Sequence, residues 1–163
     1  MTRDQERLIE QACEKVMCLY LGHADRREFA DAVALFTPDC DWQSHGVKLH
    51  GQEALLAALH ASLDTGTIRH VMTNAVVTVV DEDHAVLHDY HTLYYSADAE
   101  FETAPGPLPF EGPHRLTDSR VEFVRTPEGW RIALNDSLVV FRRDPEALVP
   151  LETWAKKEGK LAT

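Results

Sequence analysis

The spacing of apolar residues predicts two helices at the start of the chain. Residues 4–23 carry apolar side chains at helical spacing, namely Leu8, Ala12, Val16, Leu19 and Tyr20. A short second helix follows, with Phe29, Val33 and Phe36 on one face, and the turn Thr37-Pro38-Asp39 ends it. At its start, Asp25 followed three residues later by Glu28 resembles a capping box.

A strand pair and a third helix are predicted next. The segment DCDWQSHGVKLHG, residues 39–51, has the pattern of a strand, a turn near Gly46 and a brief second strand. The segment GQEALLAALHASLDTG, residues 51–66, places Leu55, Leu59 and Leu63 on one helical face, and Gly66 ends the helix.

After residue 66 the pattern becomes alternating, which is typical of strands. Four β-rich segments follow, at residues 67–80, 84–97, 114–126 and 130–143. Asp81-Glu82-Asp83 and Thr126-Pro127-Glu128-Gly129 supply short turns, so consecutive strands should pair antiparallel. The connection 98–114 is too long for a tight hairpin and contains four prolines, which fits a functional lid or a partly disordered loop.

Three helices followed by an antiparallel meander predict an α+β fold, in which a curved sheet wraps around helices and leaves a pocket for a small molecule. The length of 163 residues suits one domain. We expect a core over about residues 5–143 and a C-terminal tail, 144–163, with a short helical stretch near residues 151–157.

Composition narrows the classes of partner. The formal net charge of −11 repels phosphate backbones, which argues against nucleic acid. No apolar run approaches the roughly 20 residues that span a bilayer, and the polar start MTRDQERLIEQ does not resemble a signal peptide, so we expect a cytoplasmic protein. Three cysteines, Cys13, Cys18 and Cys40, match neither a zinc site nor a disulfide framework, and Cys13 and Cys18 are predicted to be small core residues.

His70 is the first candidate for chemistry, because GTIRHVMTN places an ionisable ring in a strand-like run. It is either a core histidine bonded to a backbone carbonyl or a base whose tautomer is fixed by a neighbouring carboxylate. A second cluster, His84, His88, Asp89 and His91, raises the question of a metal. On a strand His84 and His88 share a face and His91 points the other way, so we predict no metal and a solvated or interface position for most of these histidines.

Four segments resemble the nuclear transport factor 2-like superfamily, the cystatin-like α+β cone, and in particular its SnoaL-like branch. They are YLGHADRREFADAVALFTPDCDW, GVKLHGQEALLAAL, IRHVMTNAVVTV and RVEFVRTPEGWRI. The resemblance runs from about residue 5 to residue 143. It implies three N-terminal helices packed in a strongly curved antiparallel sheet with a central pocket.

The resemblance also implies site residues. Three enzymes of this branch perform eliminations: scytalone dehydratase, hexachlorocyclohexane dehydrochlorinase and bile-acid 7α-dehydratase. Each uses an aspartate and a histidine, which match Asp25 and His70 here. Asp31 is the rival to Asp25 as the partner of His70. By the same resemblance Tyr20, Trp42 and Asn135 should face the cavity. Tyr95 stands where scytalone dehydratase has a second histidine, and Asn135 where the dehydrochlorinase has an arginine. Tyr20, Tyr95 or Asn135 would hold a carbonyl or leaving oxygen, and Trp42 and Asn135 would bind substrate.

These matches predict a cofactor-free lyase of the dehydratase type, or an isomerase, acting on a small, largely apolar, cyclic substrate. We expect no metal or other cofactor, and we expect the chain to form a homo-oligomer, either a dimer or a trimer. The alternative is a non-catalytic ligand-binding protein, or a structural subunit such as the small subunit of a ring-hydroxylating dioxygenase, since this fold hosts unrelated functions.

Overall fold

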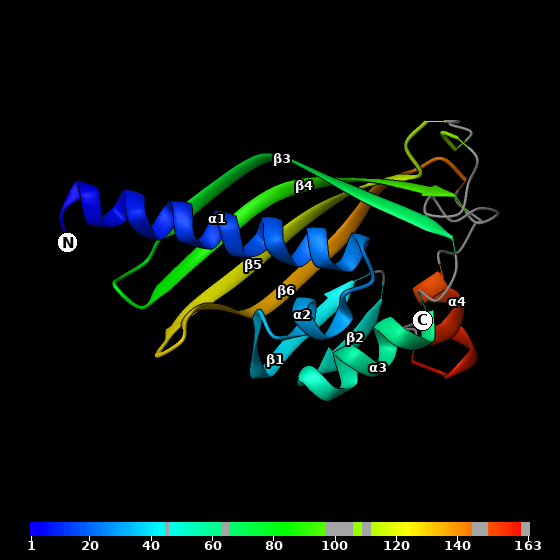
Figure 1. Cartoon of the computed structure of the whole chain (residues 1–163), viewed down its shortest axis with the longest axis horizontal. Coiled ribbons are helices and arrows are strands. Elements are labelled where there is room, and N and C mark those ends of the chain that lie inside the picture. The colour runs from blue at the N-terminus through cyan, green and yellow to red at the C-terminus, as the bar shows by residue number, and fades with distance from the viewer. Residues whose placement is uncertain (45, 63–65, 97–105, 109–111, 145–149, 161–163) are drawn as a thin grey trace.

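The computed structural model describes residues 1–44, 46–62, 66–96, 106–108, 112–144 and 150–160. Along these residues the elements follow in the order α1 (Arg3–Asp25), α2 (Phe29–Val33), β1 (Phe36–Ser44), β2 (Val47–His50), α3 (Gln52–Ser62), β3 (Thr67–Val79), β4 (His84–Ser96), β5 (Arg115–Thr126), β6 (Gly129–Arg142) and α4 (Pro150–Lys157) (Figure 1). No helix among them is long and apolar enough to cross a membrane.

The fold is α+β, as predicted, but the sheet is mixed instead of wholly antiparallel. Its six strands lie in the order β2-β1-β6-β5-β4-β3, and the pairs β3–β4, β4–β5 and β5–β6 are antiparallel. The exception is β1, which pairs parallel with β6. Turn signals predict only the hairpins between neighbouring strands, and β6 follows β1 by more than 80 residues, so no local pattern announces this pairing.

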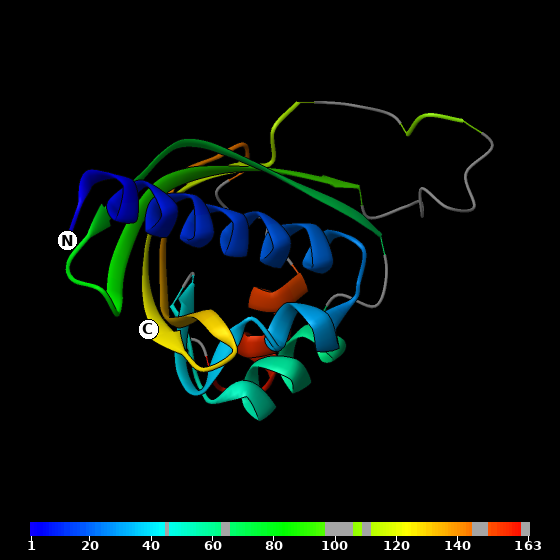
Figure 2. The ribbon, with the colours of Figure 1, turned by 60° about the vertical axis from the view of Figure 1, so that its left-hand side comes forward.

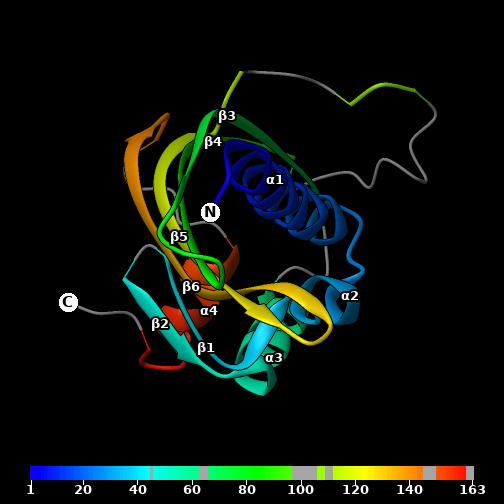
Figure 3. The same cartoon turned by 90° about the vertical axis from the view of Figure 1, so that its left-hand side faces the viewer.

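Strong curvature makes the sheet a shell around the first helix. Figures 2 and 3 show β3–β6 bending around α1, and Figure 3 shows α2 and α3 below α1. Pairing in β3 is irregular between Thr73 and Val76, where Asn74 has a φ of 54°. Bulges of this kind increase local twist and allow long strands to wrap.

The buried face of α1 differs by about one residue from the predicted one. Its buried side chains are Ile9, Cys13, Met17, Tyr20, Leu21 and Ala24. Leu8 is 66% exposed and Leu19 is 38% exposed, so the predicted stripe was wrong at these positions. Cys13 is a core residue, as expected, but Cys18 is exposed. Two adjacent apolar stripes run along this helix, and only the position of the sheet decides which one is buried.

The connection between α1 and α2 also differs from the prediction. Asp25 is the last residue of α1, not the cap of α2, whose N-cap is Glu28 and has no side-chain hydrogen bond. A capping box lies instead at Thr2 and Gln5, at the start of α1. Helix α2 ends at Val33, and Phe36 begins β1, contrary to the predicted helical face. The Asp25 carboxylate is therefore available for another partner.

The remaining elements close the shell. Leu55 and Leu59 of α3 are buried as predicted, whereas Leu63 lies outside the described residues. Helix α4 forms within the predicted tail and packs on α3, with Ala155 buried in the core. Most of the connection 98–114 lies outside the described residues, so the expectation of a lid does as well.

Candidate active site

A small cavity of about 50 Å³ lies between α1 and the concave face of the sheet. Its lining side chains are Tyr20 and Leu21 from α1, Trp42 and Ser44 from β1, His70 from β3, His91 and Leu93 from β4, Arg115 and Thr117 from β5, and Asn135 and Ser137 from β6. Most of these side chains are polar, so the cavity can hydrogen-bond a ligand from several directions.

Asp25 and His70 meet at the edge of this cavity. The Asp25 Oδ1 atom lies 2.6 Å from His70 Nδ1, and the His70 main-chain N–H donates to Asp25 Oδ2 at 2.9 Å. Both side chains are largely buried. The carboxylate thus holds the strand and the ring together. Asp31, the rival partner, lies exposed on α2.

The surroundings keep the His70 ring neutral at physiological pH. Burial lowers the pKa of His70, and nearby Arg115 and His91 lower it further, while the hydrogen bond and the charge of Asp25 oppose them. Because Nδ1 faces a carboxylate, it carries the ring proton and donates it to Asp25. The lone pair is then on Nε2, which can accept a proton at the cavity wall.

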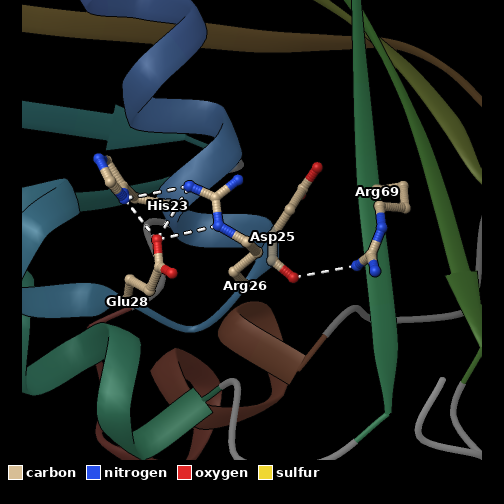
Figure 4. Close-up of polar contacts among 5 residues, drawn as sticks. All are labelled: His23, Asp25, Arg26, Glu28 and Arg69. Carbon is tan, nitrogen blue, oxygen red and sulfur yellow. Dashed lines mark hydrogen bonds and ion pairs between the residues drawn. The ribbon is translucent and has the colours of Figure 1, made fainter. Parts of the chain in front are cut away.

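The end of α1 is fastened to β3 on both sides of Asp25. Figure 4 shows the Arg69 guanidinium reaching the main-chain carbonyl of Asp25, to which it donates at 3.0 Å. Arg27 donates to the carbonyl of Gly66 at the start of the same strand. The first bond satisfies a carbonyl group at the end of the helix, and both bonds fix the helix against the strand that carries His70.

An exposed ion-pair network borders the same turn. Glu28 accepts hydrogen bonds from Arg26, at 3.0 Å, and from His23, at 2.5 Å (Figure 4). The Arg26 and His23 bonds lower the pKa of Glu28 to about 2. His23, Glu28 and Asp31 lie close enough to hold a cation, but the Glu28 carboxylate is already bonded to the side chains of Arg26 and His23. This cluster therefore acts as a surface network at the helix end.

Tyr20 and Trp42 form one wall of the cavity. The Trp42 indole N–H donates to the Tyr20 hydroxyl at 3.1 Å, which leaves the Tyr20 O–H as a donor. Burial raises the pKa of Tyr20 to about 12, so this proton stays in place. On β6, Asn135 lies beside Trp42, and its Oδ1 accepts from Ser137 at 3.0 Å. The Asn135 amide group can then donate to a ligand.

Tyr95 is not part of this group. It pairs with Ile68 across β3 and β4, and its ring lies edge-on to His114 at 5.8 Å, two residues along the strand from the cavity wall formed by Leu93. The structure brings five of the six site residues indicated by the resemblance around the cavity and leaves Tyr95 outside its lining.

His91 and Asp89 were missed by sequence reasoning. His84 and His88 are exposed as expected, but the His91 ring lines the cavity, edge-on to His70 with 6.4 Å between ring centres. Asp89 lies behind it, with Oδ2 2.5 Å from His91 Nε2. Strand parity could have found both, because they share a face with the buried residues Ala85, Leu87 and Leu93.

The family of the chain follows from comparison with known proteins. The sequence model of the SnoaL-like domain matches residues 5–134, and no curated protein sequence matches the chain. A scytalone dehydratase candidate from Novosphingobium aromaticivorans DSM 12444 has 16% identity and a TM-score of 0.73, covering 91% of this chain and 95% of its own.

Two further solved structures share the architecture. One is an NTF2-like protein with a cystatin-like fold from Novosphingobium aromaticivorans, with 23% identity, a TM-score of 0.66 and coverage of 86% of this chain and 87% of its own. The other is hexachlorocyclohexane dehydrochlorinase LinA-type3 from Novosphingobium barchaimii LL02, with 15% identity, a TM-score of 0.69 and coverage of 90% and 97%. At such identities the structures establish the fold alone. The family match spans most of the chain, which therefore belongs to the SnoaL-like domain family.

Proposed function

We propose that the protein is a cofactor-free lyase of the dehydratase type, or an isomerase, in which His70 removes a carbon-bound proton from a small substrate. The observation that carries this proposal is the 2.6 Å contact between Asp25 Oδ1 and His70 Nδ1 beside a cavity. It fixes the tautomer that leaves Nε2 as the proton acceptor.

The cavity also contains hydrogen-bond donors that can stabilise the negative charge formed when a proton is removed from carbon. Removal of the proton leaves negative charge on the substrate, which is stabilised when it spreads onto a carbonyl oxygen. The Tyr20 O–H and the Asn135 amide are the donors for that oxygen, and the Arg115 cation lies in the same lining. Tyr95, which lies outside the lining, remains a predicted hydrogen-bond donor to the substrate oxygen.

The lining also bears on the substrate. Trp42, Leu21 and Leu93 offer apolar contact to a ring, as the predicted cyclic compound requires. Thr117, Asn135 and Ser137 add polar groups to the same lining. A cyclic ketone with an apolar body and one oxygen matches this mixed lining better than a hydrocarbon would.

Hydrogen exchange tests the abstraction step without knowledge of the leaving group. The protein is incubated in D₂O with cyclohexanone and 3-hydroxycyclohexanone, and NMR follows deuterium uptake at the α-carbons and appearance of cyclohexenone. H70Q should lower the rate by about 10²-fold or more, as expected for loss of a general base. H88Q is the matched control, because His88 is an exposed histidine on β4. Rates for H70Q within a few-fold of wild type would contradict the proposal.

A structural or ligand-binding subunit is the second candidate, and the exposed apolar residues Leu138 and Phe141 favour it. Such a subunit would depend on a different protein to cover these side chains. Size-exclusion chromatography of the chain alone separates the two functions. Aggregation, with no exchange of either ketone, would support the subunit, whereas a clean species that exchanges the ketones would support the enzyme.

A further inference from the structure

Three residues of the cavity lining form a row across the concave face of the sheet. His70 on β3 pairs with Leu93 on β4, and Leu93 pairs with Arg115 on β5. All three line the cavity. Because neighbouring strands lie about 4.8 Å apart, the Cα atoms of His70 and Arg115 are about 10 Å apart, with Leu93 between them. The row therefore joins a proton acceptor, an apolar side chain and a cation.

Arg115 brings a permanent positive charge to this cavity. A guanidinium stays protonated at any physiological pH. The Arg115 side chain is half-buried, and its Nε and Nη1 atoms are shielded from solvent. Burial lowers the pKa of His70 and raises that of Tyr20, and the charge of Arg115 adds to the first effect and opposes the second. The charge thus acts on the inside of the cavity.

The end of the row at Arg115 favours a negatively charged group. In the described part of the chain, the cavity lining contains no aspartate or glutamate. Asp25 and Asp89, which are outside the lining, each contact a histidine ring. A fixed cation among neutral side chains attracts an anion locally, although the whole chain has a formal net charge of −11.

A carboxylate can bind Arg115 without displacing a protein partner. A guanidinium has five N–H donors in a planar fork, and a carboxylate takes two of them in a bidentate contact. The other donors remain for contacts within the protein. The fixed fork geometry also distinguishes arginine from lysine, which offers a point charge.

We propose that Arg115 is a specificity-determining residue that binds a carboxylate of the substrate, so that the substrate is a small cyclic keto acid. This rests on the proposed function, in which His70 removes a proton from carbon, and it assigns the substrate class. The ring lies over Leu93, with the carbon that loses its proton at His70 and the carboxylate at Arg115. The ketone oxygen keeps the donors of Tyr20 and Asn135.

Binding of a carboxylate can be measured without any reaction. Cyclohexanecarboxylate and cyclohexanecarboxamide have nearly the same shape, differ in charge and contain no ketone. NMR of ¹⁵N-histidine-labelled protein follows the His70 ring during titration with each compound at neutral pH and gives both Kd values. Wild type should bind the carboxylate at least about tenfold more tightly than the carboxamide, as expected for a charge-assisted hydrogen-bonded pair.

Variants of Arg115 assign this preference to its side chain. R115Q should remove the preference, and R115K, which keeps the charge but not the fork, should retain part of it. R120Q is the matched control, because Arg120 lies on the same strand with its side chain 43% exposed and paired with Glu122. It should bind both compounds as wild type does.

Equal binding of the two compounds by wild type would overturn the proposal, and so would a preference that survives in R115Q. Thermal unfolding shows whether each variant is folded. If R115Q does not fold, R115K gives the decision, because lysine should weaken binding of the carboxylate and leave binding of the carboxamide unchanged.

Deuterium exchange connects the contact to the reaction. In D₂O, NMR follows uptake beside the ketone of 4-oxocyclohexanecarboxylate and of 4-oxocyclohexanecarboxamide. R115Q should raise KM for the acid by about tenfold, and should leave its kcat and both constants of the amide within about threefold of wild type. An equal fall of kcat for both compounds would mean that Arg115 stabilises charge formed in the reaction, and would overturn the proposal.

The two measurements separate this inference from the proposed function. If wild type exchanges neither ketone, the proposed function fails for these compounds, and the titration with cyclohexanecarboxylate still decides the role of Arg115. If wild type exchanges both ketones but binds acid and amide equally, the proposed function stands and the assignment of a keto acid is wrong.

Discussion

The Arg69 guanidinium donates a hydrogen bond to the main-chain carbonyl of Asp25, 3.0 Å away, from the residue directly before His70. The same Nη1 atom also bonds the Ile68 carbonyl at 2.7 Å. The backbone of the carboxylate-bearing residue is therefore tied to the strand of the histidine that its side chain orients (Figure 4). We infer that Arg69 is a positioning residue for the Asp25–His70 pair.

Replacing Arg69 tests this role. R69Q should lower turnover about tenfold with little change in KM, because a small misplacement of the carboxylate weakens a base without removing it. R69K keeps a cation that can reach a carbonyl, so it should recover part of the loss. The NMR signal of the His70 Nδ1 proton should weaken in R69Q and return in R69K. A loss of stability with unchanged kinetics and an unchanged His70 signal would make Arg69 merely structural.

The stability of the protein should fall as the medium becomes acidic near the ordinary pKa of histidine. Burial lowers the pKa of His70 in the folded state, so between that value and about 6.5 the unfolded chain binds a proton that the folded chain does not. The free energy of unfolding therefore decreases as pH falls through this range. Urea unfolding of wild type and H70Q from pH 8 to pH 5 isolates the effect, and H70Q should show the smaller slope. Parallel curves would contradict it.

The catalytic activity should also depend on the titration of His70. Only neutral His70 can accept a proton, so kcat/KM should rise with pH and reach half of its plateau below pH 6.5. A midpoint above pH 6.5 would mean that the Asp25 charge outweighs burial at this ring. The midpoint of the kcat/KM profile gives the pKa of His70 in the folded free protein, which should also be the lower end of the pH range over which the free energy of unfolding changes.

The strands show how much of the fold can be predicted from the sequence alone. The four predicted segments at 67–80, 84–97, 114–126 and 130–143 agree within one residue with β3 to β6. Long alternating runs and short polar turns fix these elements locally. The parallel partner of β1 depends on where a distant strand returns, and the buried stripe of α1 depends on where the sheet lies. Neither is encoded in a short window.

The candidate site also contains residues that the local sequence pattern predicts and residues that it does not. Asp25 and His70 are 45 residues apart and were paired by resemblance to a family, since spacing cannot bring a helix end to a particular strand position. The pattern of β4 contained enough information to place His91 inward, because its neighbours on one face are apolar. It could not show that Asp89 would be fully buried behind it, which requires β5 and Ser119 to be in place.

The Tyr20–Trp42 hydrogen bond should contribute measurably to the free energy of unfolding. Y20F removes the acceptor and leaves the buried indole N–H without one, which costs about 1–3 kcal/mol. W42F removes the donor as well, so Y20F should cost much less in a W42F background. A double-mutant cycle from urea unfolding gives the coupling between the two side chains. Additive losses would show that the 3.1 Å contact contributes nothing beyond packing.

The convex face of the sheet carries apolar side chains that favour self-association. Strand register places Val71, Tyr90, Leu138 and Phe141 on neighbouring rows of the face opposite the cavity. Leu138 is 71% exposed and Phe141 is 69% exposed. Apolar side chains clustered in this way mark protein interfaces more often than open surface. We therefore expect the chain to form a homo-oligomer through this face.

Charge placed on that face should break the oligomer without unfolding the chain. The L138D/F141D variant should elute as a monomer by size-exclusion chromatography with light scattering, since burying carboxylates against an apolar partner is unfavourable. L8D is the matched control, because Leu8 is similarly exposed but lies on α1. Its oligomeric state should equal that of wild type. A monomeric wild type would refute self-association. Aggregation cured by L138D/F141D would instead mean that the face normally binds a different protein, as a structural subunit requires.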